Sequence, residues 1–331
     1  MATYFITQME LSNGDQGKLL PPKPEEPLDS DCCGTGCSPC VFDLFKTKLQ
    51  RWESECEKIR TGGNLSLPEN IHKNEEFDYI TPYEYVQFVV KNITQECHSC
   101  KIVHFNKACE TSQMLPHFNY NSFPVKLGQH VVLRLKDKSR QYTVLDIKSD
   151  GSLNILFKIY QTGLLTPLID NLVIGDKVQM RGPFGKEFHY EANSYDNIIV
   201  LAAGTGIAPF CRIFDKILHN DKDDTRVLLL FSCRNENEIL LLNKCKEWAR
   251  SWNFEVQYYL SKVEDEKFAV GIHYGMNVYC KKLDKTDIEL LINLRKSKNN
   301  VYLICGTKSF EKDILKYLQS FDVEEEKIKL F

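Results

Sequence analysis

The strongest constraint on the fold is an alternation of apolar and amphipathic segments that starts near residue 195 and continues to residue 331. Four short segments are rich in apolar residues: NIIVLAA at 197–203, RVLLLFS at 226–232, FEVQYYL at 254–260 and VYLICG at 301–306. Segments with helical periodicity, such as NEILLLNKCKEWAR and FEKDILKYLQSF, stand between and after them. Apolar strands that alternate with helices form a parallel sheet covered on both faces. We therefore expect a nucleotide-binding type of α/β domain over residues 191–331.

The preceding part of the chain has a different rhythm, with strands and almost no helices. YEYVQFVV, KIVHFNKA, HVVLRL, RQYTVLDI and LNILFKIY are short, rich in β-branched and aromatic residues, and separated by turn residues. Such a series predicts an antiparallel β-barrel, here over residues 81–190. In LNILFKIY, alternate residues face the core, and the other face, which includes Lys158 and Tyr160, can meet a ligand.

The first 80 residues are organised differently again. Residues 1–28 are polar, end in PPKPEEPL and predict a disordered leader. Residues 29–62 form a small Cys-rich module whose second half has Phe42, Phe45, Leu49 and Trp52 at the spacing of a short amphipathic helix. Residues 63–80 are predicted to form a linker.

Composition narrows the class of protein. The chain has 42 Lys and Arg against 45 Asp and Glu, a net charge of -3, which argues against nucleic acid as a partner. We expect no membrane span, because no apolar run is long enough, and no secretory signal. Most of the 13 cysteines stand singly inside apolar segments, as is typical of a reducing compartment, so we expect a soluble cytoplasmic protein.

The segment LAAGTGIAPF, residues 201–210, predicts a strand, a glycine turn and a helix. Ligands of open α/β sheets bind beyond the carboxyl ends of the strands, and small residues end both this strand and ICG at 304–306. The helix would offer free amides to a negative group. The spacing matches neither the P-loop nor the dinucleotide fingerprint, so a tight turn without a ligand is the alternative.

The barrel offers a second candidate site in RQYT. Arg140 and Tyr142 project to the same side of a strand; an arginine can clamp a phosphate, and a tyrosine can pack against an aromatic ring. Taken alone, this alternation is also typical of an ordinary barrel surface.

In their order along the chain, these motifs resemble those of a known family. RQYT is followed by KIY at 158–160, G-x-x-T at 163–166, IGD and RGPFG, GTGIAP at 204–209 and CG at 305–306. This series resembles the ferredoxin-reductase type of flavoprotein and, within it, the NADH-cytochrome b5 reductases, over about residues 80–331. The segment CCGTGCSPCVFDLF resembles a small oxidoreductase-like domain.

The resemblance implies an FAD-binding barrel, an NAD(P)-binding α/β domain and hydride transfer from NADH to FAD. Single electrons would then pass to a haem protein such as cytochrome b5. Arg140 would hold the flavin phosphate, Tyr142 would lie against the flavin ring and Thr143 would bond the flavin. The backbone at Leu156 and Lys158 would contact FAD, and the Lys158 side chain would help hold the nicotinamide cofactor.

The same resemblance assigns the other positions. It places Tyr160 beside the nicotinamide cofactor and the segment Leu164, Leu165 and Thr166 around the FAD pyrophosphate. It places Gly204, Thr205, Gly206, Cys305 and Gly306 at the nicotinamide. Thr143 and Cys305 would flank the hydride transfer, which needs no acid or base residue.

Several residues depart from the family pattern. Leu164 replaces a lysine, Ala208 replaces a threonine near the flavin, and both prolines of the R-P-Y-T-P motif are absent. These losses motivate an alternative function, a non-catalytic flavin-fold protein that binds or regulates a partner.

The N-terminal cysteines offer a third interpretation. Cys32, Cys33, Cys37 and Cys40 lie close enough in sequence to bind zinc or an iron–sulfur cluster, in a metal- or redox-sensing interaction protein. The alternative is a Cys-rich loop that docks a helix or a partner. Cys97 and Cys100, with His98 and His104, form a second and weaker cluster.

Cofactor preference is a testable consequence of two residues. The family carries an Asp that disfavours the 2′-phosphate of NADPH, whereas this chain aligns Ser261 there, beside Lys262. We therefore predict turnover with both NADH and NADPH. Comparison of kcat/KM for the two cofactors is the measurement, and an NADH preference above about a hundredfold would refute the prediction.

Overall fold

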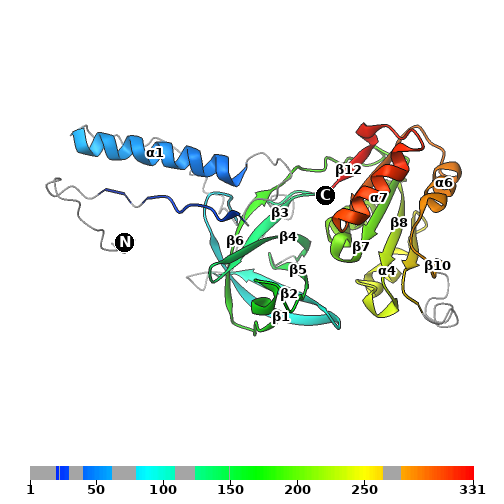
Figure 1. Cartoon of the computed structure of the whole chain (residues 1–331), viewed down its shortest axis with the longest axis horizontal. Coiled ribbons are helices and arrows are strands. Elements are labelled where there is room, and N and C mark those ends of the chain that lie inside the picture. The colour runs from blue at the N-terminus through cyan, green and yellow to red at the C-terminus, as the bar shows by residue number, and fades with distance from the viewer. Residues whose placement is uncertain are drawn as a thin grey trace.

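The computed structural model describes residues 20–21, 23–29, 40–61, 80–108, 124–148, 150–263 and 277–331. The molecule has three parts along its longest axis (Figure 1). Helix α1 (Val41–Thr61) lies at one end, a β-barrel lies in the middle, and an α/β domain lies at the other end. No helix in the described part of the chain is both long and apolar enough to cross a membrane.

The barrel is closed and built from antiparallel strand pairs, in the order β1-β2-β5-β4-β3-β6. Its strands are β1 (Val86–Cys97), β2 (Cys100–Lys107), β3 (His130–Leu135), β4 (Lys138–Ile147), β5 (Leu153–Lys158) and β6 (Lys177–Phe184), and a short helix, α2 (Thr166–Asp170), lies between β5 and β6. Phe88, Phe105 and Phe157 are fully buried in its core. Alternation of apolar residues along these strands therefore produces the closed core that the sequence predicted.

The α/β domain contains a parallel sheet with the strand order β10-β9-β8-β7-β11-β12. Its strands are β7 (Asn197–Ala203), β8 (Arg226–Cys233), β9 (Phe254–Leu260), β10 (Asn277–Tyr279), β11 (Asn300–Cys305) and β12 (Ile328–Leu330). Its helices are η3 (Gly204–Ile207), α3 (Ala208–Leu218), η4 (Glu236–Glu238), α4 (Leu242–Trp248), α6 (Lys285–Leu294), α7 (Lys308–Gln319) and η5 (Glu325–Lys327).

Helices cover both faces of this sheet. Ile198 and Val200 of β7 belong to the same core cluster as α3 and α4, whereas Ile199 and Leu201 belong to the cluster of α6 and α7. The predicted fold class, an antiparallel barrel followed by a parallel α/β domain, is confirmed. Strands β10 and β12, which the sequence analysis did not identify, have only three residues each and are too short to show a periodicity.

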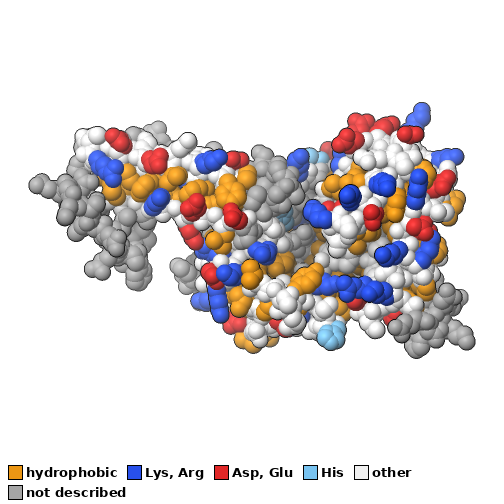
Figure 2. Space-filling model, in the orientation of Figure 1, with side chains coloured by type: hydrophobic (Ala, Val, Ile, Leu, Met, Phe, Trp, Pro, Cys, Tyr) orange, Lys and Arg blue, Asp and Glu red, His pale blue; other side chains and the backbone are white. Residues whose placement is uncertain are grey.

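Helix α1 contacts the barrel near its first residue. Val41 is buried in a small cluster with Val132 of β3 and Phe184 of β6, and apolar side chains follow one face of the helix (Figure 2). Trp52 donates a hydrogen bond from Nε1 to the carbonyl oxygen of Pro21 at 2.7 Å. Cys40 precedes the helix as a free thiol, and Cys32, Cys33 and Cys37 lie outside the described residues, as do most of residues 1–39 and 62–79.

The barrel packs directly on the α/β domain. Leu145 of β4 and Leu156 of β5 share an apolar cluster with Phe210 and Phe214 of α3. Leu156 is only 5% exposed, so the outer face of β5 meets this domain rather than a ligand until the strand reaches Lys158. Arg212 of α3 donates a hydrogen bond from Nη1 to the carbonyl oxygen of Val125 at 2.8 Å, across the same junction.

Candidate functional site

A cleft of about 1250 Å³ opens where the barrel meets the carboxyl ends of the parallel strands. The barrel contributes Thr143 at the middle of β4, Lys158 at the end of β5, and Tyr160 just beyond it. The α/β domain contributes a larger set of the sequence-predicted residues: Gly204, Thr205, Gly206, Ser261, Cys305 and Gly306. Residues from motifs more than 150 positions apart therefore share one cavity.

The floor of the cleft is the close approach of the backbone segments that follow β7 and β11, two parallel neighbours in the sheet. A Cβ atom added to Gly206 would lie 2.3 Å from the carbonyl oxygen of Cys305, and one added to Gly306 would lie 3.0 Å from the Cβ of Ala203. Gly204 is different: it has φ +54° and open space around its missing Cβ. The two glycines of GTG therefore have different roles. Gly204 permits a left-handed backbone conformation, and Gly206 leaves room for the neighbouring backbone because it has no side chain.

Burial keeps Cys305 uncharged. Desolvation, together with the nearby carboxylate of Glu311, raises the pKa of its thiol to about 12. A thiol with this pKa is protonated at neutral pH, so it is a poor nucleophile. Cys305 lines the cleft, and its expected place beside the nicotinamide stays a prediction.

The barrel wall contains a histidine that the sequence analysis did not identify. His130 of β3 is the direct ladder partner of Thr143 on β4. Burial lowers the pKa of His130 to about 4, which makes the ring neutral, and its Nε2 has no hydrogen-bond partner among the described residues. His130 does not itself line the cleft; strand pairing places it beside Thr143, which does.

Other predicted residues lie outside the cleft. Arg140 is exposed, and its Nη1 donates to the carbonyl oxygen of Ser139 at 2.8 Å. Tyr142 packs edge-on against Phe157, with 4.6 Å between ring centroids, and burial raises the pKa of its hydroxyl. The ring of Tyr142 therefore borders the barrel core rather than the lining of the cleft.

The segment expected to wrap a pyrophosphate contains a local pair of hydrogen bonds. The hydroxyl of Thr166 donates to the carbonyl oxygen of Tyr160 at 2.9 Å and accepts from its N–H at 3.0 Å. Leu164 is 64% exposed, and Leu165 is buried in the barrel core. Ala208 begins α3, and Lys262 donates its backbone N–H to the carbonyl oxygen of Arg234 at 2.7 Å, both outside the lining of the cleft. The cofactor roles of these residues, and of Leu156, stay predictions.

Polar residues beyond the predicted set also line the cleft. Ser232 and Asn235, at the end of β8, each hold a buried oxygen without a hydrogen-bond partner among the described residues. Arg234, Lys282 and Lys308 add positive charge to that of Lys158, whose Nζ lies 3.6 Å from Glu238. Unpaired oxygens can bond ribose hydroxyls and the cations can bind phosphates, so the lining fits a dinucleotide. The sequence SCRN at 232–235 was the available signal, because it directly follows an apolar strand.

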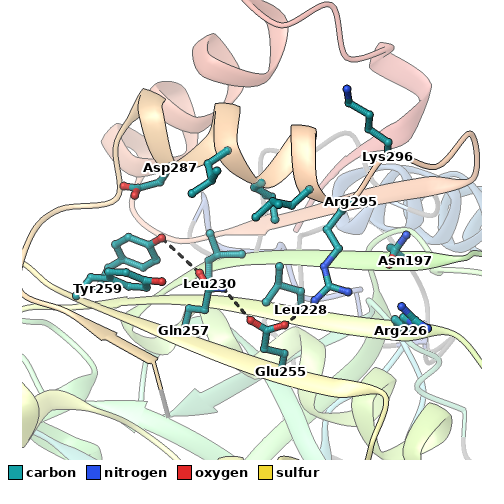
Figure 3. A pocket seen from close by; sticks show the side chains of 14 residues that line it. Asn197, Arg226, Leu228, Leu230, Glu255, Gln257, Tyr259, Asp287, Arg295 and Lys296 are labelled. Atoms are coloured by element: carbon teal, nitrogen blue, oxygen red, sulfur yellow. Dashed lines mark hydrogen bonds and ion pairs between the residues drawn. The ribbon is translucent and has the colours of Figure 1, made fainter. Parts of the chain in front are cut away.

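A second cavity of about 470 Å³ lies between α6 and the sheet (Figure 3). Tyr259 borders both cavities, but none of the sequence-predicted site residues lines the smaller one. Its main acidic side chains are already paired: Glu255 with Arg295 at 2.5 Å, and Asp287 with Lys281 at 2.7 Å. The larger cleft is therefore the candidate site.

The described residues give no support to a metal site. No group of three or more His, Cys, Asp or Glu side chains is placed to hold an ion within the described ranges. His104 contacts Thr94 through Nε2 at 3.3 Å, and Cys97 and Cys100 are free thiols. The structure therefore does not bring His98, His104 and these cysteines together as a metal site.

Family comparisons agree with this division of the chain. Residues 87–190 match the model of an oxidoreductase FAD-binding domain, and residues 200–316 match that of an oxidoreductase NAD-binding domain. Residues 15–61 match the model described as oxidoreductase-like protein, N-terminal.

Similar proteins extend the match over nearly the whole chain. A human protein named NADH-cytochrome b5 reductase-like is 31% identical over 314 residues, covering 93% of this chain and 94% of that protein. The mouse protein of the same name is 30% identical over 316 residues, with 93% and 95% covered. The cytochrome b5 reductase domain of Ulva prolifera nitrate reductase has the same fold, with a TM-score of 0.62, 18% identity, and coverage of 76% of this chain and 99% of that one.

Two glycine substitutions test the origin of the cleft floor. We predict that Gly206→Ala raises KM for NADH at least about tenfold and costs about 1–3 kcal/mol of stability, because its Cβ collides with the Cys305 carbonyl. Gly204→Ala is the matched control, since it meets no atom and costs only about 1–2 kcal/mol through its backbone angle. Steady-state kinetics and urea unfolding measure both effects. Equal changes in KM for the two variants would contradict this account of the floor.

Proposed function

Because this chain belongs to the family of NADH-cytochrome b5 reductase-like oxidoreductases, we propose that it takes hydride from NADH or NADPH onto bound FAD. We further propose that it passes single electrons to a haem protein of the cytochrome b5 type. The observation that carries the proposal is the shared cleft, to which the FAD-binding and NAD-binding domains both contribute side chains.

The residues that line the cleft divide the binding of the two cofactors between them. Lys158, Arg234, Lys282 and Lys308 supply positive charge for phosphate groups, and Ser232 and Asn235 supply unpaired oxygens for ribose hydroxyls. The bare floor at Gly206 and Gly306 accepts a flat ring close to the backbone. Thr143 and Tyr160 form the opposing barrel wall, where the flavin ring is expected.

Bound FAD would supply the redox chemistry, because it accepts a hydride and releases electrons one at a time. The protein's part is to hold the two rings in contact, and this step needs no general acid or base. Cys305 suits that task because its protonated thiol presents an uncharged surface. His130, the ladder partner of Thr143, is held neutral by burial and adds no charge to this wall.

The junction of the two domains is the proposed docking face for the electron acceptor. Lys and Arg side chains gather there on the face shown in Figure 2. Tyr160, which is 55% exposed, stands at the barrel edge of the cleft with Lys158 beside its ring. The family resemblance implies an acidic acceptor of the cytochrome b5 type. A basic rim attracts such a partner electrostatically.

Anaerobic reduction tests the proposed activity. We expect the purified full chain to show flavin absorbance that bleaches when NADH is added without oxygen and recovers when an oxidised b5-type cytochrome is added. Protein without flavin colour, or with colour that NADH leaves unchanged, would instead favour the non-catalytic alternative. Recovery with a non-haem one-electron dye but not with the cytochrome would retain the reductase and reject the proposed acceptor.

The role of Lys158 gives a separate prediction. Lys158→Met should raise KM for NADH by about tenfold and leave kcat nearly unchanged, because it removes one charged contact worth about 1.5–3 kcal/mol. Lys101→Met is the matched control: Lys101 is also a barrel lysine, but it pairs with Asp170 at 2.5 Å, away from the cleft. Similar KM values for the two variants would show that Lys158 does not bind the cofactor.

A further inference from the structure

The turn between β1 and β2 carries two cysteines in a fixed relation. Cys97 and Cys100 are direct ladder partners on either side of the two-residue turn His98–Ser99. Cα atoms of opposed residues in an antiparallel pair lie about 4.5–5.5 Å apart, which is within the range that a disulfide spans. Both thiols are free.

Hydrogen bonds hold this turn in place. The side-chain amide of Gln95 donates from Nε2 to the carbonyl oxygens of Cys97 at 2.5 Å and Cys100 at 3.2 Å. The N–H of Ile159 donates to the carbonyl oxygen of Ser99 at 2.7 Å, which pins the turn to the end of β5. The backbone therefore holds the two cysteines opposite each other.

Both sulfur atoms lie near a single hydroxyl. The Oγ of Ser99 is 4.0 Å from the Sγ of Cys97 and 3.9 Å from the Sγ of Cys100. Burial and then the adjacent Cys97 thiol, which hydrogen-bonds it, raise the pKa of Cys100 to about 12. Cys97 is the more accessible of the two, since Cys100 is only 1% exposed.

The turn is also part of the candidate site. Cys97, His98 and Ser99 line the large cleft, and Cys100 is the ladder partner of Lys158. The carboxylate of Glu96 accepts a hydrogen bond from the N–H of Leu241 at 2.6 Å, which ties the turn to the α/β domain. A covalent change at this turn would therefore act on the cleft and on the junction between the domains.

We propose that Cys97 and Cys100 form a reversible disulfide by exchange with a low-molecular-weight disulfide such as glutathione disulfide. The Cys97 thiolate attacks one sulfur of the reagent, forms a mixed disulfide and releases one glutathione thiolate. The mixed disulfide removes the charge and hydrogen bond of Cys97 that help raise the pKa of Cys100. The Cys100 sulfur, on losing its proton, then attacks the Cys97 sulfur and releases the second glutathione. Two protein thiols are oxidised, one glutathione disulfide is reduced to two glutathione thiols, and no further reagent is needed.

The disulfide has an expected consequence for the cleft. Closing the bond draws the two strand ends together beside Lys158 and shifts the residues of the turn that line the cavity. We expect weaker NADH binding in the oxidised protein. This consequence rests on the proposed function, whereas formation of the disulfide does not.

Peptide mapping tests the disulfide directly. Trypsin cleaves after Lys91 and Lys101, so both cysteines fall in the single peptide 92–101, NITQECHSCK. The reduced full chain is equilibrated with glutathione disulfide, alkylated under native and then denaturing conditions, and digested. We expect this peptide to lose two hydrogens and to carry no alkyl group, and dithiothreitol to restore the doubly alkylated form. Double alkylation at every glutathione ratio, or a stable glutathione adduct on Cys97, would overturn the proposal.

Kinetics test the consequence, with a matched control variant. Oxidation should raise KM for NADH at least about threefold in the wild type and in Cys280→Ser, which removes a partly exposed cysteine outside the cleft, but not in Cys97→Ser. A disulfide that forms while KM stays constant would reject the effect on the cleft. Absence of NADH turnover in the fully reduced wild type would reject the proposed function and leave the peptide result intact.

Discussion

The candidate site depends first on the apolar packing of the barrel against helix α3. Leu145 and Leu156 project from the barrel and pack in the cluster that contains Phe210 and Phe214. Burial of such side chains contributes about 1.5–3 kcal/mol each, so this contact fixes the relative position of two separately built cores. Fixed in this way, the end of β5 faces the carboxyl ends of β7 and β11, and the cleft lies between them.

Within the cleft, burial keeps the Cys305 thiol protonated and uncharged. The same lining carries Lys158, Arg234, Lys282 and Lys308, on which phosphates would be held. Hydride transfer between two stacked rings calls for contact and orientation rather than for a charged catalyst. The arrangement of neutral floor and cationic surroundings is therefore coherent with the chemistry of the family. The thiol pair at Cys97 and Cys100 adds a redox-sensitive group at the margin of the same cavity.

The sequence was sufficient for the two-domain fold because its periodicities are local. Apolar runs such as 198–202 predict a buried strand, and the glycines of GTG predict a turn. Two kinds of site residue were harder to foresee. His130 pairs with Thr143 across the barrel ladder, and Asn235 lines the cleft just after the end of β8; neither belongs to a predicted motif. Thr166 makes a contact that the sequence did not predict: its hydroxyl bonds the backbone of Tyr160, and its expected role at a ligand stays a prediction.

The central claim is that one cleft holds both cofactors, with flavin on the barrel wall and nicotinamide on the glycine floor. A crystal structure of the full chain with FAD and NAD⁺ tests it most directly. We expect the nicotinamide ring to pack against Gly206 and Cys305, with the phosphates of the cofactor toward Arg234 and Lys308. A dinucleotide bound elsewhere, for example in the smaller cavity beneath α6, would contradict it.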